Sequence, residues 1–107
     1  YRRRRGRVMA QGTGKGYVIA RAIVTDPVTW AAYGAAATPV MAQHGGRPIV
    51  RGGRCEVVEG EARARNAVLE FPSYDDALAY VRSESYGEVR RLRDGAGSID
   101  MIVVEGA

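Results

Sequence analysis

The order of strand-like and helix-like segments along the chain is the feature that most constrains its fold. Segments rich in β-branched residues and bounded by turn residues predict strands, and apolar residues at helical spacing predict helices. The predicted strands span residues 16–25, 48–58, 65–71 and 98–105, and the predicted helices span residues 27–43 and 73–93. The resulting order is β-α-β-β-α-β, which predicts an α+β fold of the ferredoxin-like type with a four-stranded antiparallel sheet.

Turn and capping residues mark the ends of the two helices. An Asp-Pro pair at residues 26–27 predicts an N-cap followed by proline in the first turn. Gly45 predicts a left-handed C-cap for the same helix. Ser73, with Asp76 three residues later, is a weaker relative of the capping box, and a break near residues 83–85 divides the second helix.

One face of the predicted sheet has no cover within the chain. The two helices can cover only one face, and strand alternation places Tyr17, Ile19, Arg21 and Ile23 on the other. That second face is half apolar, and a chain of 107 residues has no segment left to cover it. We therefore expect a single ferredoxin-like domain, residues 15–107, that pairs face to face with a second copy as a homodimer.

Basic residues are concentrated at the N-terminus. The net charge is +4, but five of the 16 basic residues lie within residues 1–8. The rest of the chain is almost balanced, whereas a nucleic-acid binder carries its basic residues as a folded patch. Residues 1–14 have no apolar period and are predicted to form a disordered basic tail. We therefore do not expect nucleic acid as a partner, although a tether to RNA through these arginines stays open as an alternative.

No segment of the sequence predicts export or a membrane. A signal peptide needs an apolar region of about 7–15 residues after its basic residues, and none follows these arginines. The longest apolar runs are also too short to cross a membrane. We expect a cytoplasmic protein with no membrane partner. We further hypothesise that Met9 is the native start, with residues 1–8 read from upstream.

The chain has a single cysteine, Cys55. One cysteine excludes an internal disulfide framework and a four-cysteine zinc site. A lone thiol is more often a small core residue than a nucleophile. Because no acidic or histidine cluster at metal-ligand spacing accompanies Cys55, the sequence predicts no metal and no cofactor.

The stretch HGGRPIVRGGR, residues 44–54, repeats Gly-Gly-Arg and begins with the only histidine. In a structural interpretation, the first glycine pair ends the helix and the second pair, at residues 52–53, forms a β-bulge or a tight bend. In a functional interpretation, Arg47 and Arg54 border a cleft between the first helix and the sheet and hold a carboxylate, an enolate or a phosphate. His44 would then act as a general base or acid. The residues alone leave both interpretations open.

Further candidate ligand-binding residues lie on the predicted strands and the first helix. By alternation, Tyr17, Arg21 and Glu70 share the dimer-facing side of the sheet and could line an interior cavity. In the alternative interpretation, Arg21 and Glu70 form a structural ion pair and do not bind a ligand. Trp30 and Tyr33 are either core residues or the wall of a pocket for an aromatic ligand.

Four stretches of the sequence resemble the domain-of-unknown-function family 1330. They are KGYVIARAIVTDPVTWAAY, HGGRPIVRGGRCEVVEG, AVLEFPSYDDALAYVRSESY and IDMIVVEG, which together extend over residues 15–106. The family is similar to the dimeric α+β barrel group, in which two ferredoxin-like subunits pack their sheets together. That group includes cofactor-independent monooxygenases, lactone isomerases, haem-dependent chlorite-degrading enzymes and ligand-sensing domains. The resemblance therefore implies a dimeric α+β barrel and assigns no reaction.

The functional expectation follows from these residues. We expect a small homodimeric protein that binds a small organic acid or an aromatic metabolite beside the first helix and the sheet. It would act as a cofactor-independent enzyme of the monooxygenase or isomerase type, with His44 transferring a proton and Arg47 or Arg54 holding developing negative charge. The alternative is a non-catalytic ligand-binding or sensing module.

Overall fold

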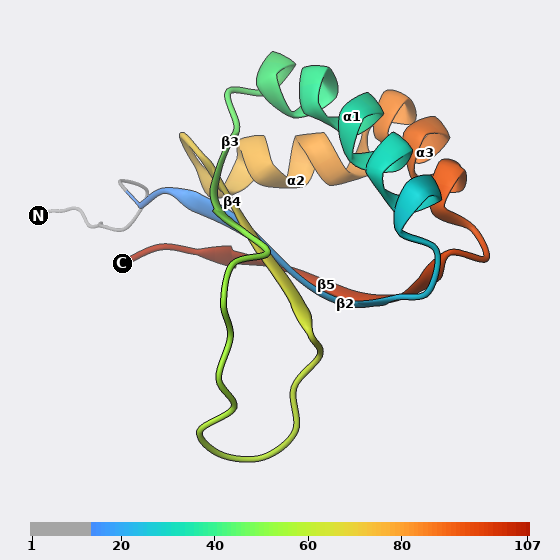
Figure 1. Cartoon of the computed structure of the whole chain (residues 1–107). Coiled ribbons are helices and arrows are strands. Elements are labelled where there is room, and N and C mark those ends of the chain that lie inside the picture. Colours follow the sequence, from blue (N-terminus) through green and yellow to red (C-terminus); the bar gives the residue numbers. More distant parts are fainter. Residues whose placement is uncertain (1–13) are drawn as a thin grey trace, which may run out of the picture.

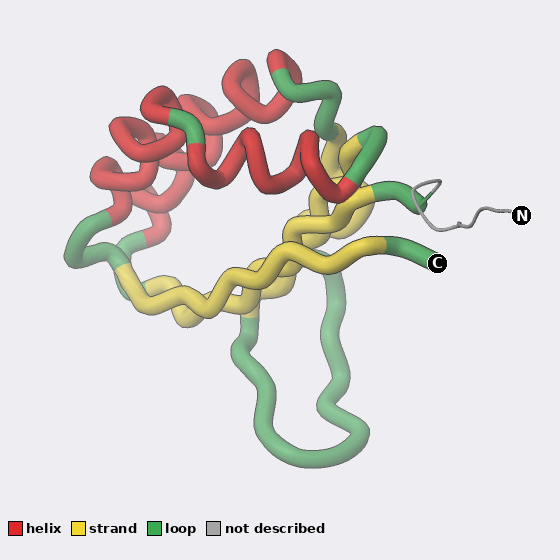
Figure 2. Tube along the Cα trace, turned by 180° about the vertical axis from the view of Figure 1, so that it is seen from behind, coloured by secondary structure: helices red, strands yellow, loops and turns green. Residues whose placement is uncertain are grey.

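A four-stranded antiparallel sheet carries all the helices on one of its faces (Figures 1 and 2). The computed structural model describes residues 14–107, so the predicted tail lies outside the described residues apart from Gly14. Across the sheet the strands lie in the order β3 (Arg47–Arg51), β4 (Arg65–Phe71), β2 (Gly16–Val24) and β5 (Gly97–Glu105). The helical layer contains α1 (Pro27–Gln43), α2 (Tyr74–Arg82), α3 (Glu84–Arg90) and the short 3-10 helix η1 (Arg91–Arg93). The predicted α+β class, element order and antiparallel sheet are confirmed.

Helix α1 begins and ends at the capping residues predicted from the sequence. The Asp26 carboxylate accepts a hydrogen bond from the backbone N–H of Thr29 at 3.1 Å, which makes Asp26 the N-cap. At the other end, Gly45 adopts a φ of 79° and its N–H donates to the carbonyl of Ala42. The next N–H, from Gly46, donates to Met41, and this pair of bonds is the Schellman motif.

Serine caps also begin α2 and α3. The Ser73 hydroxyl oxygen accepts from the N–H of Asp76 at 3.0 Å and donates to the Asp76 carboxylate at 2.9 Å, so the predicted capping interaction is present. Ser83 ends α2 and caps α3 by accepting from the N–H of Tyr86. The predicted break in the second helix therefore marks the point where one helix stops and another starts.

The core lies between the helices and the covered face of the sheet. Its main cluster is fully buried and includes Val18 on β2, Phe71 on β4, and Ala77 and Tyr80 on α2. A second cluster of Ala22, Trp30 and Ala96 lies near the start of α1. The strand residues among them, Val18, Ala22 and Phe71, occupy the alternate positions opposite the face predicted to be uncovered.

The opposite face of the sheet is open and carries an apolar row. Ile19 pairs with Val68 of β4 on one side and with Ile102 of β5 on the other, so three apolar side chains cross the sheet side by side. Ile102 is 56% exposed and Ile23, farther along β2, is 49% exposed. No described helix lies over this face (Figures 1 and 2). We refer to it below as the open face.

The predicted second strand, residues 48–58, is wrong at its C-terminal end. Strand β3 ends at Arg51, and residues 52–64 form a loop that extends away from the helices, beyond the open face (Figures 1 and 2). The chain leaves the sheet because Gly52 takes a φ of 65°, which a strand cannot continue. The irregularity in the β3–β4 register also lies between Pro48 and Val50 rather than at the glycine pair.

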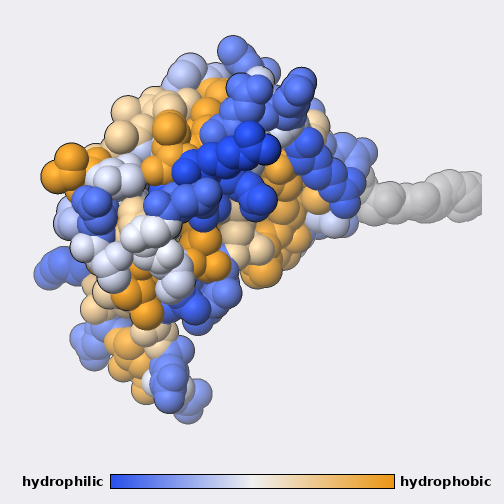
Figure 3. All heavy atoms as spheres, turned by 90° about the vertical axis from the view of Figure 1, so that its right-hand side faces the viewer, coloured by the Kyte–Doolittle hydropathy of each residue, from blue (hydrophilic) through white to orange (hydrophobic). Residues whose placement is uncertain are grey.

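The loop at residues 52–64 exposes apolar side chains and the single thiol. Val58 is 87% exposed and Val57 is 49% exposed, and Figure 3 shows the loop projecting from the body of the molecule with apolar atoms on its surface. Cys55 is exposed in the same loop, so its interpretation as a core residue is wrong. The base of the loop is fixed by Arg63, whose guanidinium contacts Asp100 at 3.1 Å and the Ser98 hydroxyl at 2.7 Å, both on β5.

The two glycines at positions 52 and 53 provide a matched test of backbone conformation. Gly52→Ala should lower the free energy of unfolding by about 1–2 kcal/mol, because its positive φ is unfavourable for an L-residue. Gly53→Ala should change it by less than about 0.5 kcal/mol, because a Cβ there meets nothing within 4 Å and the φ is not left-handed. Urea unfolding of both variants gives the comparison. Equal stability of the two would show that Gly52 has no special backbone role.

Within the described residues, none of the helices has both the length and the apolar character needed to span a membrane.

Candidate functional site

A cavity of about 350 Å³ lies between α1 and the covered face of the sheet. It exists because the facing side chains are small. Alanine, glycine and threonine line it from α1, and alanine lines it from β2 and β4; these residues are Ala31, Gly34, Ala35, Ala37, Thr38, Ala20, Ala22 and Ala67. Protein interiors are otherwise packed as densely as organic crystals, and a volume of this size is typical of a small-molecule site.

The cavity wall toward α3 is aromatic. Trp30 and Tyr33 line it, with their ring centroids 5.7 Å apart in an edge-to-face arrangement. The guanidinium of Arg93 lies 5.0 Å from the Tyr33 ring centroid and 5.7 Å from that of Trp30, behind this wall. Both predicted aromatic residues are therefore part of a pocket wall, and Trp30 is at the same time a buried core residue.

Two arginines supply the charge of the cavity lining. Arg51, the last residue of β3, and Arg65, the first residue of β4, are the charged side chains among the residues that line it. Within residues 14–107 neither arginine takes part in an ion pair. A Cβ added to Gly52 would lie 3.1 Å from a terminal nitrogen of Arg65, so the absence of a side chain at Gly52 leaves room for this guanidinium. The pair leaves positive charge available at the edge of an apolar cavity.

The tyrosine hydroxyls at the cavity are held in their neutral form. Tyr33 and Tyr80 both line it, and burial raises the pKa of each phenol well above its ordinary value. The neighbouring Tyr86 phenol adds to the effect on both. These hydroxyls therefore stay protonated at neutral pH and can donate hydrogen bonds.

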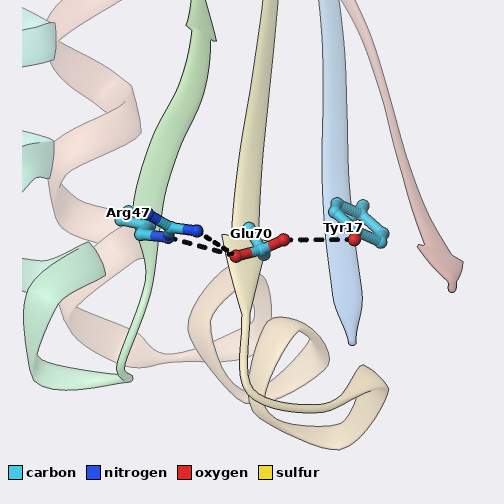
Figure 4. Close-up of polar contacts among 3 residues, drawn as sticks. All are labelled: Tyr17, Arg47 and Glu70. Atoms are coloured by element: carbon cyan, nitrogen blue, oxygen red, sulfur yellow. Dashed lines mark hydrogen bonds and ion pairs between the residues drawn. The ribbon is translucent and has the colours of Figure 1, made fainter. Parts of the chain in front are cut away.

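Three of the sequence-predicted residues meet on the open face, away from the cavity. Figure 4 shows Arg47, Glu70 and Tyr17 on the neighbouring strands β3, β4 and β2. Arg47 donates to one oxygen of Glu70 at 2.9 and 3.1 Å, and the Tyr17 hydroxyl donates to the other at 3.1 Å. The Arg47 hydrogen bonds hold the pKa of the Glu70 carboxyl below its usual range, and burial together with the Glu70 contact raises that of Tyr17. The trio is an ionised carboxylate bonded on both sides.

The predicted Arg21–Glu70 ion pair is wrong. Arg21 lies on the open face, but its neighbours across the sheet are Asn66 of β4 and Asp100 of β5. Glu70 lies opposite Tyr17, four residues farther along the strand pair. Four residues of strand correspond to about 13 Å, and Glu70 is paired with Arg47 instead.

The two residues predicted to be catalytic lie apart from the cavity lining and from each other. His44 is the C-cap of α1, where its Nδ1 lies 3.0 Å from the carbonyl oxygen of Val40 and its ring lies 6.0 Å from that of Tyr80. Arg54 is exposed in the loop at residues 52–64 and borders a shallow hollow with Cys55 and Glu56. Among the described residues, no three His, Cys, Asp or Glu side chains are grouped as a metal site would require.

Arg51, Arg65 and Tyr80 are the site residues that sequence reasoning missed. One signal was available for Arg65, because strand alternation puts it on the same face as Ala67, Leu69 and Phe71, opposite to Glu70. Arg51 carried no such signal, since the register shift after Pro48 changes which β3 side chains face the helices.

Fold and site together define a class: a ferredoxin-like α+β protein with an arginine-edged cavity beneath its first helix. The chain belongs to the family described as domain of unknown function (DUF1330), whose model matches residues 15–107. Among curated proteins, no sequence matches the chain significantly.

Solved structures with the same fold have low sequence identity to this chain. A protein of unknown function from Rhodopseudomonas palustris is 19% identical with a TM-score of 0.72, over 89% of this chain and 84% of that one. A dimeric ferredoxin-like protein of unknown function from Bacteroides fragilis is 14% identical with a TM-score of 0.58, over 89% and 99%. A candidate antibiotic biosynthesis monooxygenase from Nitrosomonas europaea is 16% identical with a TM-score of 0.50, over 91% and 93%. These likenesses establish the ferredoxin-like fold.

Proposed function

We propose that the protein is a homodimer that binds a small aromatic or aliphatic carboxylic acid in the cavity between α1 and the sheet. The observation that carries the proposal is the pairing of a largely apolar cavity of about 350 Å³ with two arginines, Arg51 and Arg65, on its edge. The apolar body of an acid would contact Trp30, Tyr33 and the alanines, and its carboxylate would take the guanidinium groups.

The homodimer is supported by the open face. In its apolar row Ile102 is exposed and Ile19 and Val68 are half-buried in a single subunit, and apolar surfaces left open in this way mark interaction sites. The similar protein from Bacteroides fragilis is described as dimeric. A second copy placed face to face would cover the row.

The residues that line the cavity favour a ligand-binding protein over an enzyme. Among the described residues, the cavity lining contains no histidine, carboxylate or thiol that could remove a proton. An enzyme of the monooxygenase or isomerase type, with His44 and Arg54 in catalysis, is the second candidate. Its support is the likeness in fold to the Nitrosomonas europaea protein. If the protein is such an enzyme, it should convert a bound acid to product, and His44→Ala should abolish this turnover. A binding module would show no turnover.

Calorimetry and thermal unfolding with 3-phenylpropanoate test the proposed site. Saturating acid should raise the melting temperature by several degrees, because a ligand at 100 times its Kd adds about 2.7 kcal/mol. The uncharged 3-phenylpropanamide is the control ligand and should bind much more weakly, since it offers the arginines no charge. Equal binding of acid and amide would contradict the proposed role of the arginines.

Filling the cavity should separate stability from binding. Ala67 lies in the middle of β4 and faces the cavity, so Ala67→Ile should raise the free energy of unfolding by about 0.5–2 kcal/mol. The same variant should no longer bind 3-phenylpropanoate, because the added side chain occupies the ligand's volume. Urea unfolding and calorimetry measure the two effects. A stabilised variant that still binds the acid would place the ligand elsewhere.

A further inference from the structure

One tyrosine of the cavity wall makes no hydrogen bond through its hydroxyl to any of the described residues. This tyrosine, Tyr80 on α2, belongs to a cluster with Tyr33 on α1 and Tyr86 on α3. The Tyr86 hydroxyl donates to the Met101 sulfur at 3.9 Å and lies 2.7 Å from the Tyr33 hydroxyl oxygen. Either hydroxyl can be the donor in this second contact. Both of these phenols are therefore hydrogen-bonded within the protein.

Tyr80 differs from its two neighbours. Its side chain is 2% exposed and lines the cavity, and its hydroxyl has no hydrogen-bond partner among the described residues. A hydroxyl at a cavity wall without such a partner can bond to a molecule inside the cavity. Burial, reinforced by the Tyr33 and Tyr86 phenols, raises the pKa of Tyr80. The group is therefore a neutral hydroxyl, available to donate and to accept.

The arginines and the tyrosine group lie on different sides of the cavity. Arg65 begins β4, whereas Met101, which lies 3.9 Å from the Tyr86 hydroxyl, is on β5. Strand β2 separates β4 from β5, so two strand spacings, or about 10 Å, lie between them across the sheet. Tyr80 lines the same cavity from α2. A molecule that contacts both Tyr80 and the arginines carries a carboxylate at one end, an apolar middle and an oxygen function at the other.

We propose that the cavity selects carboxylic acids that carry a hydroxyl or carbonyl oxygen remote from the carboxylate, and that Tyr80 is the residue that recognises this oxygen. The inference rests on the proposed function and specifies its ligand class. A hydroxyaryl acid meets the requirements, since its ring packs against Trp30 and Tyr33, its carboxylate meets Arg51 and Arg65, and its hydroxyl meets Tyr80.

A pair of acids that differ by one hydroxyl tests the selectivity. Wild-type protein should bind 3-(4-hydroxyphenyl)propanoate about tenfold more tightly than 3-phenylpropanoate, the value expected for one net hydrogen bond at the upper end of its range. Tyr80→Phe should remove this preference and leave the affinity for 3-phenylpropanoate within about twofold of wild type. Tyr74→Phe is the matched control, because Tyr74 begins α2 outside the cavity lining, and it should keep the preference.

Melting temperatures of the free variants give a readout independent of the ligand. Tyr80→Phe removes a hydroxyl that has no partner within residues 14–107 and should leave the melting temperature unchanged or raise it, whereas Tyr33→Phe breaks the bond to Tyr86 and should lower it. Binding of both acids to wild type with equal affinity would overturn the inference while the proposed function stands. A preference that survives Tyr80→Phe would do the same. Failure of both acids to bind would instead contradict the proposed function itself.

Discussion

Replacing Arg51 and Arg65 together with alanine should weaken binding of 3-phenylpropanoate by about 100-fold. Each arginine is expected to contribute a charge-assisted hydrogen bond to the carboxylate, which is worth about 1.5–3 kcal/mol. Both side chains are largely solvent-exposed, so the lower figure is appropriate for each, and two such bonds correspond to about 3 kcal/mol. Isothermal titration calorimetry of the double variant, with each single variant beside it, measures the loss and its additivity.

Two further arginines serve as controls for this experiment. Arg54→Ala removes a charge from the loop at residues 52–64, and Arg82→Ala removes one from the end of α2. Neither residue lines the cavity, so both variants should bind the acid as wild type does. A loss in Arg54→Ala comparable to that of the double variant would move the binding site to the second Gly-Gly-Arg and would revive the sequence hypothesis for that stretch.

Introducing a charge into the apolar row of the open face should convert the proposed homodimer into monomers. Ile102 ends the apolar row on β5 and is 56% exposed within one subunit. Burying an aspartate in its place between two sheets would cost several kcal/mol per subunit, while the exposed position in the free subunit should tolerate the change. Light scattering at micromolar concentration should therefore give twice the subunit mass for wild type and the subunit mass for Ile102→Asp.

An exposed valine on another surface is the control for the dimer experiment. Val28 lies in the first turn of α1, on the helical side of the molecule, and is 82% exposed. Val28→Asp adds the same charge to an exposed apolar site outside the open face, and it should keep the dimer mass. A wild-type monomer, or an Ile102→Asp dimer, would rule out the face-to-face arrangement.

Local signals in the sequence were sufficient for most of the fold. The Asp-Pro pair at residues 26–27, the glycine at position 45 and the serine at position 73 act on the few residues around them, and the helices begin and end where these residues require. Strand alternation likewise identified the buried face of β2. These features depend on interactions over three or four residues, which a sequence pattern records directly.

The site depended on register and on turn conformation, which the pattern does not record. A strand through residue 58 would have put Arg54 in the sheet, but the left-handed φ of Gly52 ends β3 at Arg51. The second glycine of that pair, Gly53, has an unremarkable conformation, so a Gly-Gly pair does not reveal which member turns the chain. Arg51 and Arg65 come together through the long-range pairing of β3 with β4.

The sequence predicted where the cavity lies but not why there is space for it. A cleft between the first helix and the sheet was expected on account of its arginines, whereas the space arises from the small residues of α1 and the sheet. Alanine is also the best helix former, so a run of alanines in a helix predicts stability as readily as it predicts a void. Which of the two applies is decided by the residues on the facing strands, Ala20 and Ala67, which are themselves small.

The exposed thiol in the projecting loop offers a practical means of studying the proposed dimer. Cys55 is the only cysteine of the chain, so a nitroxide reagent would label each subunit at a single position with no engineering of the sequence. In a homodimer the two spin labels form one pair, and pulsed electron paramagnetic resonance would return one distance distribution between the two loops. A narrow distribution would indicate loops held in place by the neighbouring subunit, and a broad one would indicate loops that sample many positions around it. The same thiol accepts a hydrogen bond from the Asn66 amide at 3.4 Å, so the label would also report on the segment where the loop joins β4.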